Sequence, residues 1–200
     1  MSSVTPLQVN NRVRQPFIYR ARYRISQFWR GLIARVAPEE RLLAVQVLPP
    51  RAVALFDRMP IDAQRHSLNV LQAVRGMGIK DSDLDAAALL HDVGKLSSTC
   101  NGPRVGLWLR GPLVVLEATA PALLTSVAKP EPESGWRYVV YAHREHPSIG
   151  AKWAASAGCS ALTCWLIRHH QDERSRLESS GVREYELRLL AALQEADNRS

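Results

Sequence analysis

Cysteine and strand-like patterns are both scarce in this chain of 200 residues. The three cysteines, Cys100, Cys159 and Cys164, are an odd number without the spacing of a metal or disulfide motif, which excludes a disulfide-stabilised scaffold. We therefore expect the protein in a reduced, cytoplasmic compartment. The sequence shows no signal-peptide pattern, which agrees with this expectation. Internal repeats are also absent. Because Ala/Leu/Arg/Glu periodicities recur and strand signals do not, the sequence predicts an all-α fold.

Long apolar runs are missing as well. The most apolar stretch, residues 105–128, is interrupted by Arg110, Pro112, Glu117 and Pro121. These residues make it a poor membrane span and favour a buried helix pair or the face of a homodimer. An apolar content of 46% is nevertheless enough to exclude a disordered chain, so we expect one soluble domain with one core.

Acidic residues are absent from residues 1–37, which carry seven arginines. The remaining 19 basic residues equal the 19 acidic ones, so the net charge of +7 lies in this segment. Aromatic residues such as Phe17, Tyr23 and Trp29 are interleaved with the arginines. The pattern predicts a basic N-terminal arm over residues 1–37 that could contact nucleic acid, another polyanion, an anionic membrane or an acidic partner. The alternative is a helix packed on the domain of residues 38–200 with its arginines in solvent.

The positions of the histidines and of two aspartates carry more information about function. Five of the six histidines and two aspartates follow one another as His66, His91-Asp92, His146, His169-His170 and Asp197. Imidazole and carboxylate groups are ligands of divalent transition metals, and an imidazole-rich set favours Fe, Mn, Co, Ni or Zn over Mg. Two such ions among neutral imidazoles and two carboxylates would leave a formal charge of about +2, which suits phosphate. A bound ion also lowers the pKa of its water from 15.7 to about 7.

The surrounding sequence predicts helices that bring these residues together. A helix over residues 84–92, started by the polar residues 81–83 and stopped by Gly94, would carry His91 and Asp92 in its last turn. A second, over residues 161–170 and capped by Ser160, would end at the histidine doublet. His66 falls within an amphipathic segment from residue 61 to about 75, and Asp197 follows a helix over residues 183–196. Further helices are expected to begin near Pro38, Pro50 and Pro60. Helix ends and one helix face can thus meet in a helical bundle.

Five short strings carry a family resemblance: QRHSL at residues 64–68, ALLHDVGK at 88–95, EHPSIGA at 145–151, IRHHQ at 167–171 and AD at 196–197. They resemble the signature of the HD-domain metal-dependent phosphohydrolase superfamily over residues 60–198. The resemblance implies that His66, His91, Asp92 and Asp197 bind one metal and that His146 and the second doublet add another. It also implies that Asp92 bridges the two metals and that Lys95 contacts the substrate phosphate.

The sequence differs from two well-known branches of this superfamily, which reduces the number of branches that it resembles. Residues 171–184 lack the Gly-x-Gly-Tyr-Pro stretch of the cyclic-di-GMP phosphodiesterases, and the chain is too short for the dNTP triphosphohydrolases. The nearer similarity is to small bacterial enzymes that cleave dinucleoside tetraphosphates, although the insertion between Lys95 and His146 is longer here.

Several residues keep alternative interpretations. His169 is either a second ligand or an orienting neighbour of His170, and Lys95 either contacts phosphate or caps a helix C-terminus. His143 is excluded as a ligand because it is expected on a solvated turn beside Arg144. The loop marked by Pro130, Pro132 and Gly135 is followed by Trp136, Tyr138 and Tyr141, which could stack on a base at the entrance or belong to the core.

The sequence therefore predicts a dinuclear phosphohydrolase in which a metal-bound hydroxide cleaves a phosphoester or phosphoanhydride, with nucleotides or dinucleotides as expected substrates. Asp92 and Lys95 are its expected catalytic residues. The rival hypothesis is a regulatory, nucleic-acid-binding or membrane-binding module that uses the fold as a scaffold. It accounts poorly for two buried carboxylates, since buried charges need partners.

Overall fold

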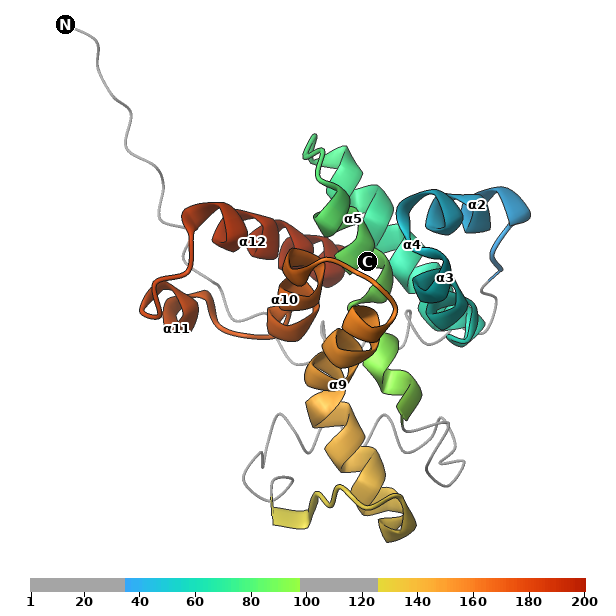
Figure 1. Ribbon diagram of the computed structural model, residues 1–200, viewed down its shortest axis with the longest axis vertical. Coiled ribbons are helices and arrows are strands. Elements are labelled where there is room, and N and C mark those ends of the chain that lie inside the picture. Colours follow the sequence, from blue (N-terminus) through green and yellow to red (C-terminus); the bar gives the residue numbers. More distant parts are fainter. Residues whose placement is uncertain (1–34, 98–125) are drawn as a thin grey trace, which may run out of the picture.

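The computed structural model describes residues 35–97 and 126–200, and every regular element in these two stretches is a helix (Figure 1). The predicted all-α fold is therefore confirmed. The elements are α2 (Pro38–Val47), α3 (Pro50–Asp57), α4 (Ile61–Gly76), α5 (Ser82–Leu90), the 3-10 helices η1 (Val93–Leu96) and η3 (Pro132–Ser134), α9 (Trp136–Ser156), α10 (Ala161–His169), α11 (Arg174–Glu178) and α12 (Glu184–Arg199). The basic arm up to residue 34, the apolar stretch up to residue 125 and Cys100 lie outside the described residues.

Prolines mark the starts of the first three described helices, as the sequence predicts. Pro38 and Pro50 are the first residues of α2 and α3, and Pro60 immediately precedes α4. Proline suits these positions because the first N–H groups of a helix have no partner within it. The Glu40 carboxylate of α2 accepts the backbone N–H of Ala37 at 3.0 Å, so one of the remaining donors is also satisfied.

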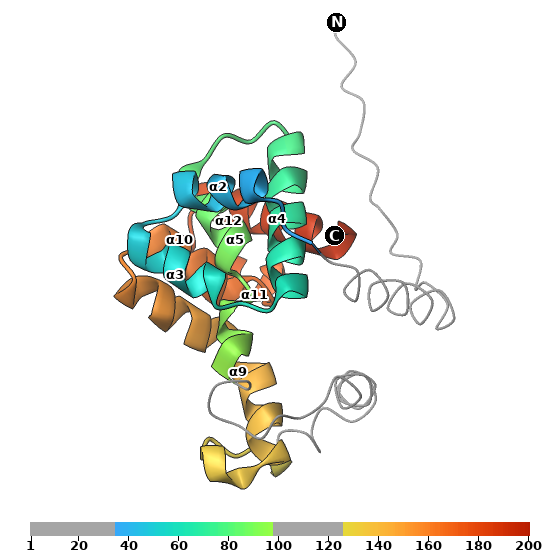
Figure 2. The ribbon, with the colours of Figure 1, turned by 90° about the vertical axis from the view of Figure 1, so that its right-hand side faces the viewer.

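Helix α5 lies at the centre of the core. Six of its nine residues are buried, because its Ala- and Leu-rich sequence is apolar on every side. It packs against α2, α4, α10 and α12, and Figures 1 and 2 show these helices around it. The C-terminal end of α5 therefore points into the protein, and the next residue, His91, is fully buried.

Helix α9 is 21 residues long, and its first half projects beyond the bundle (Figures 1 and 2). The predicted solvated turn around Arg144 is wrong, because α9 runs through it and even includes Pro147. The aromatic residues at the start of α9 differ in burial, and the burial of Tyr138 fits the core interpretation. Tyr138 is buried and stacks on Tyr141 with ring centroids 6.1 Å apart, whereas Trp136 is 51% exposed.

Gly94 allows η1 to approach α9 more closely than any side chain would permit. It was expected to stop the preceding helix, but α5 ends at Leu90 and Gly94 lies within η1. A Cβ atom on Gly94 would lie 2.0 Å from the carbonyl oxygen of His146 and 2.7 Å from the backbone nitrogen of Gly150. Backbone atoms cannot rotate away, so the contact between η1 and α9 requires glycine at this position.

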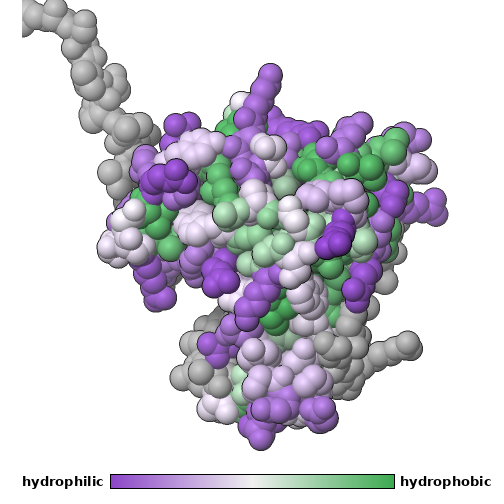
Figure 3. Space-filling model, in the orientation of Figure 1, coloured by the Kyte–Doolittle hydropathy of each residue, from purple (hydrophilic) through white to green (hydrophobic). Residues whose placement is uncertain are grey.

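Hydrophilic residues cover most of the face in Figure 3, with smaller apolar patches over α2. Leu42 and Val45 of α2 are about half exposed. Within the two described stretches, no helix is both long enough and apolar enough to cross a membrane.

The Gly94 contact yields a prediction about stability. Gly94→Ala should lower the free energy of unfolding by about 3 kcal/mol, because the methyl group overlaps the backbone of α9. Gly76→Ala is the matched control, since a Cβ there has no atom within 4 Å, and it should be neutral or stabilise by up to about 1 kcal/mol. Urea denaturation of both variants measures the difference. Equal effects would show that the close approach does not constrain the fold.

A second prediction concerns the ion pair between α2 and α4. Arg65 of α4 donates to both carboxylate oxygens of Glu40, one of them at 2.6 Å. These bonds, with help from the Ala37 N–H, lower the pKa of Glu40 from 4.5 to about 2 against the opposing effect of burial. The stabilisation is therefore complete above pH 4.5 and is lost as the pH falls towards 2.

Glu40→Gln should consequently reduce stability by about 1 kcal/mol at pH 7, the size expected for a partly exposed pair. The difference from the parent should shrink as the pH falls below 4.5. Glu39→Gln, in the same turn and exposed, should change stability by less than about 0.5 kcal/mol. Thermal unfolding between pH 2 and 7 measures both, and a constant difference across this range would contradict the assignment.

Candidate metal centre

Six of the seven predicted ligands come together at one place in the structure. They are supplied by the middle of α4, the end of α5, the middle of α9, the end of α10 and the last turns of α12. In chain order these residues are His66, His91, Asp92, His146, His170 and Asp197. The carboxylate oxygens and Nε2 atoms of the six side chains form two adjacent groups.

The first group contains His66, His91 and Asp92, whose ligand atoms lie within 4.8 Å of one another. Asp197 joins it: its Oδ1 is 2.9 Å from Nε2 of His66 and 3.5 Å from Nε2 of His91. The two Nε2 atoms are 3.3 Å apart. Ligands that share one zinc-sized ion at about 2.1 Å are separated by about 3.0 to 3.4 Å, so these distances suit a single ion.

The second group contains Asp92, His146 and His170, and all three residues are buried. Nε2 of His146 lies 3.4 Å from Nε2 of His170 and 3.4 Å from Oδ1 of Asp92. Nε2 of His170 lies 3.9 Å from the same oxygen. This group could also hold an ion.

Asp92 belongs to both groups through different oxygens. Its Oδ1 faces His146 and His170, whereas its Oδ2 is 3.8 Å from Nε2 of His91. A carboxylate with one oxygen toward each group is placed as a bridging ligand would be.

Three of the histidines are oriented by the same hydrogen bond. Nδ1 lies 3.0 Å from the Ala88 carbonyl oxygen in His91, 2.6 Å from that of His143 in His146, and 2.8 Å from that of Ile167 in His170. A carbonyl oxygen can only accept, so Nδ1 must carry the hydrogen in all three rings. In the neutral form of each ring Nε2 is then the unprotonated nitrogen, which is the atom that a metal ion would bind.

The helices leave these carbonyl oxygens available. Ala88 and Ile167 lie in the last turns of α5 and α10, where backbone carbonyls lack partners within the helix. His143 is in mid-helix, but the residue four positions later is Pro147, which has no N–H to donate. The proline thus frees the carbonyl that orients His146. Sequence reasoning missed this role of His143 although its signal, a proline four residues later, was visible.

Protonation differs among the ligands. Burial lowers the pKa of His91, but the charge of Asp92 and the hydrogen bond to Asp197 outweigh it and raise the pKa above its usual value, so this ring would release a proton on binding a metal ion. Burial by itself raises the pKa of Asp92, but the charges of Lys95 and His91 outweigh it and hold the pKa well below its usual range. Burial also raises the pKa of Asp197. Hydrogen bonds from His66 and His91 outweigh this effect, so the pKa of Asp197 is lowered as well. Burial and the neighbouring charge of His91 lower the pKa of His170 to about 3. Both carboxylates are therefore ionised, and His170 is neutral, at neutral pH.

The N-termini of α5 and α10 are tied together at the ends opposite to their ligands. Asp81 and Ser160 cap the two helices as predicted, accepting backbone N–H groups at 2.8 and 3.0 Å. Asp83 of α5 then accepts hydrogen bonds from Ser160 and from the Thr163 hydroxyl, the latter at 2.9 Å. These hydrogen bonds fix the N-terminus of α5 relative to that of α10. They therefore help to set the positions of His91 and His170, which follow the C-terminal ends of the two helices.

Lys95 and His169 occupy different surroundings from the six ligands. Lys95 lies in η1, with its Nζ 2.6 Å from Oδ2 of Asp92 and its side chain 45% exposed. His169 is in neither group: its Nδ1 is 2.6 Å from Oδ2 of Asp172, and its ring lies on Trp165 with centroids 4.8 Å apart. The structure thus brings Lys95 to the centre and does not bring His169 there.

Comparison of the chain with protein-family models, with curated proteins and with solved structures found no match. The geometry of the side chains is therefore the basis for any assignment of function.

The adjacent histidines provide a matched test of the two groups. If both groups hold an ion, the parent should bind about two divalent ions per chain, and His170→Ala should bind about one because it removes a ligand of the second group. His169→Ala should retain about two. Metal analysis of protein purified without chelator measures all three. The same loss in both variants would place His169 among the ligands after all.

Proposed function

We propose that this protein is a divalent-metal-dependent phosphohydrolase with two ions in its active centre. The observation that carries the proposal is the position of Asp92, whose two oxygens face two histidine-rich groups. The first group would hold one ion through His66, His91 and Asp197, and the second would hold the other through His146 and His170, with Asp92 common to both. The resemblance of the motifs to HD-domain phosphohydrolases is in accord with this arrangement.

Charge favours a phosphate substrate. Four neutral imidazoles and two carboxylates would leave two divalent ions with a formal charge of about +2, which attracts the oxygens of a phosphate. When bound, ions of this kind lower the pKa of water to about 7 and stabilise negative charge on phosphoryl oxygens. Phosphoester or phosphoanhydride hydrolysis is the reaction class that uses both properties.

The residues of the chain have separate tasks in this proposal. Asp92 and the oriented imidazoles would hold the ions, and the lowered pKa values of Asp92 and His170 leave these two groups in the form that binds metal. Lys95 is the cation at the exposed side of Asp92, where its ammonium group can donate hydrogen bonds to a substrate phosphate. A scaffold without chemistry would have no need for three buried imidazoles whose Nε2 atoms converge on a carboxylate.

Two variants test the proposal. Asp92→Asn should lose metal from both groups and lower the hydrolysis of nucleotide and sugar phosphates by at least about 1,000-fold, because it removes the charge that both ions share. Lys95→Ala should keep its metal and lower kcat/KM by about 100-fold through lost stabilisation of the transferring phosphate. Metal analysis and a phosphate-release assay measure the two effects.

Lys152→Ala is the control, since Lys152 is an exposed lysine on α9. It should change neither quantity. If the metal-loaded parent hydrolyses no phosphate ester or anhydride, the proposed function is wrong. If Lys95→Ala loses metal, Lys95 supports the centre and does not contact the substrate.

A further inference from the structure

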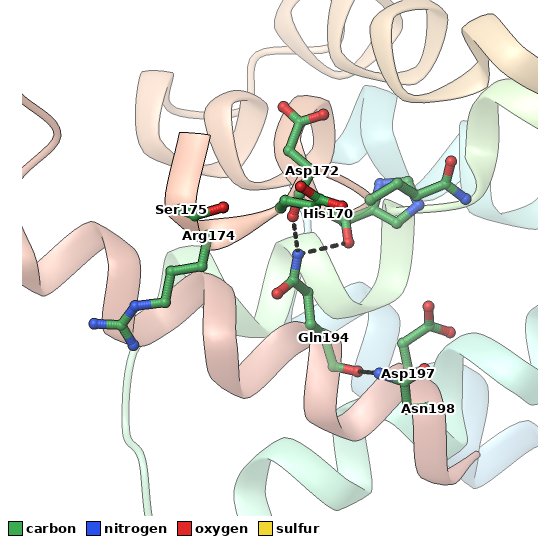
Figure 4. A pocket seen from close by; sticks show the side chains of 9 residues that line it. His170, Asp172, Arg174, Ser175, Gln194, Asp197 and Asn198 are labelled. Atoms are coloured by element: carbon green, nitrogen blue, oxygen red, sulfur yellow. Dashed lines mark hydrogen bonds between the residues drawn. The ribbon is translucent and has the colours of Figure 1, made fainter. Parts of the chain in front are cut away.

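A cavity of about 570 Å³ adjoins the metal centre on the side of α12. It lies between the turn that follows α10 and the last turns of α12, as seen in Figure 4. His170 and Asp197 are among its lining residues, and they are ligands of different groups. A molecule in this cavity would therefore touch the edge of both groups at once.

The wall of the cavity is held in place by Gln194 of α12. Its Nε2 donates to the carbonyl oxygens of His170 and Asp172, at 3.1 and 2.9 Å (Figure 4). Asn198 in turn donates to the backbone carbonyl of Gln194 at 2.7 Å. The turn after α10 is thereby fastened to α12, so the cavity is a built feature of the fold.

The lining consists almost entirely of side chains that form hydrogen bonds, and most of them can accept. Besides the two ligands, it consists of the carboxylates of Asp172 and Glu173, the amides of Gln171, Gln194 and Asn198, the hydroxyl of Ser175, and Arg174. Among these described residues none is aromatic or aliphatic. Pockets of about 300–1,000 Å³ that bind small molecules are usually lined mainly by apolar and aromatic side chains. The volume here fits a small molecule, and the polar side chains of the lining favour one that is rich in hydrogen-bonding groups.

Arg174 does not offset the acidic lining. Figure 4 shows its guanidinium directed away from His170 and Asp197. Its Nε donates to Glu178 at 2.6 Å, and its Nη2 lies 3.3 Å from Glu184. The charges of the lining are therefore those of Asp172 and Glu173. Asp172 is hydrogen-bonded to His169, which is charged only if protonated, and Glu173 lies 3.7 Å from the exposed Arg176, a distance too long for a hydrogen bond.

We propose that this cavity binds the hydroxyl-rich organic part of a phosphate monoester, such as a sugar or polyol monophosphate. This inference rests on the proposed function, because it assumes that the single phosphate is bound at the metal centre. Carboxylate and amide oxygens accept hydrogen bonds from hydroxyl groups, whereas the only aromatic ring among the described lining residues is the His170 imidazole, which is held at the metal centre. Additional phosphates would meet the charges of Asp172 and Glu173, so nucleoside triphosphates and dinucleoside polyphosphates are poor substrates.

The experiment compares two substrates on the full-length, metal-loaded protein. Ribose 5-phosphate represents the proposed class, and a nucleoside triphosphate represents the polyphosphates. The parent should have the higher kcat/KM for ribose 5-phosphate. Glu173→Lys should shift the ratio of the two kcat/KM values towards the triphosphate by at least about tenfold, because it replaces a repelling charge by an attracting one. The double variant Asp172→Asn/Glu173→Gln should shift it in the same direction by a smaller factor.

Glu195→Lys is the matched control, since Glu195 lies on α12, pairs with Arg199 and does not line the cavity. It makes the same change in net charge and should leave the ratio within about twofold of the parent. Circular dichroism and metal content show whether each variant is folded and loaded.

The possible failures are distinct. If the parent hydrolyses phosphate esters but prefers the triphosphate, or if Glu173→Lys and Glu195→Lys change the ratio equally, the inference about the cavity is overturned and the proposed function stands. If the loaded parent hydrolyses neither substrate nor any other phosphate ester, both are overturned.

Discussion

A hydrogen bond from Nδ1 to the carbonyl oxygen three residues earlier orients His91, His146 and His170. Without it each imidazole could present either nitrogen, and the ring could turn. With it, the three Nε2 atoms converge on the carboxylate of Asp92. Helix ends and a proline supply the carbonyls, so the orientation comes from places where the backbone has acceptors to spare.

The packing of the bundle serves the same centre. Asp83 ties the N-termini of α5 and α10, so the two helices reach the centre in a fixed relation. Gly94 lets η1 lie against the backbone of α9, and the carbonyl that it approaches most closely is that of His146. Buried carboxylates and imidazoles are costly unless they have partners, and here each is the partner of another. A bound metal ion would take the place of these contacts between the carboxylates and the imidazoles.

Local features and the convergence of six ligands were predictable from the sequence, whereas the other tertiary contacts were not. The caps at Asp81 and Ser160 follow from side chains close to the helices they begin, and both are found as predicted. Gly94 was interpreted as a helix stop because a glycine required by another segment has no local sign of that segment. His169 and His170 are neighbours on one helix, so their side chains point about 100° apart, and only the packing of α10 decides which one faces Asp92. The cavity beside α12 has no motif at all.

The most direct test of a centre shared through Asp92 is a crystal structure of the metal-loaded protein with anomalous scattering recorded at the metal edge. The account predicts two peaks about 3.5 to 4 Å apart. One oxygen of Asp92 should coordinate each ion, and every imidazole bound to them should coordinate through Nε2. A single peak, or two peaks of which only one contacts Asp92, would contradict the account.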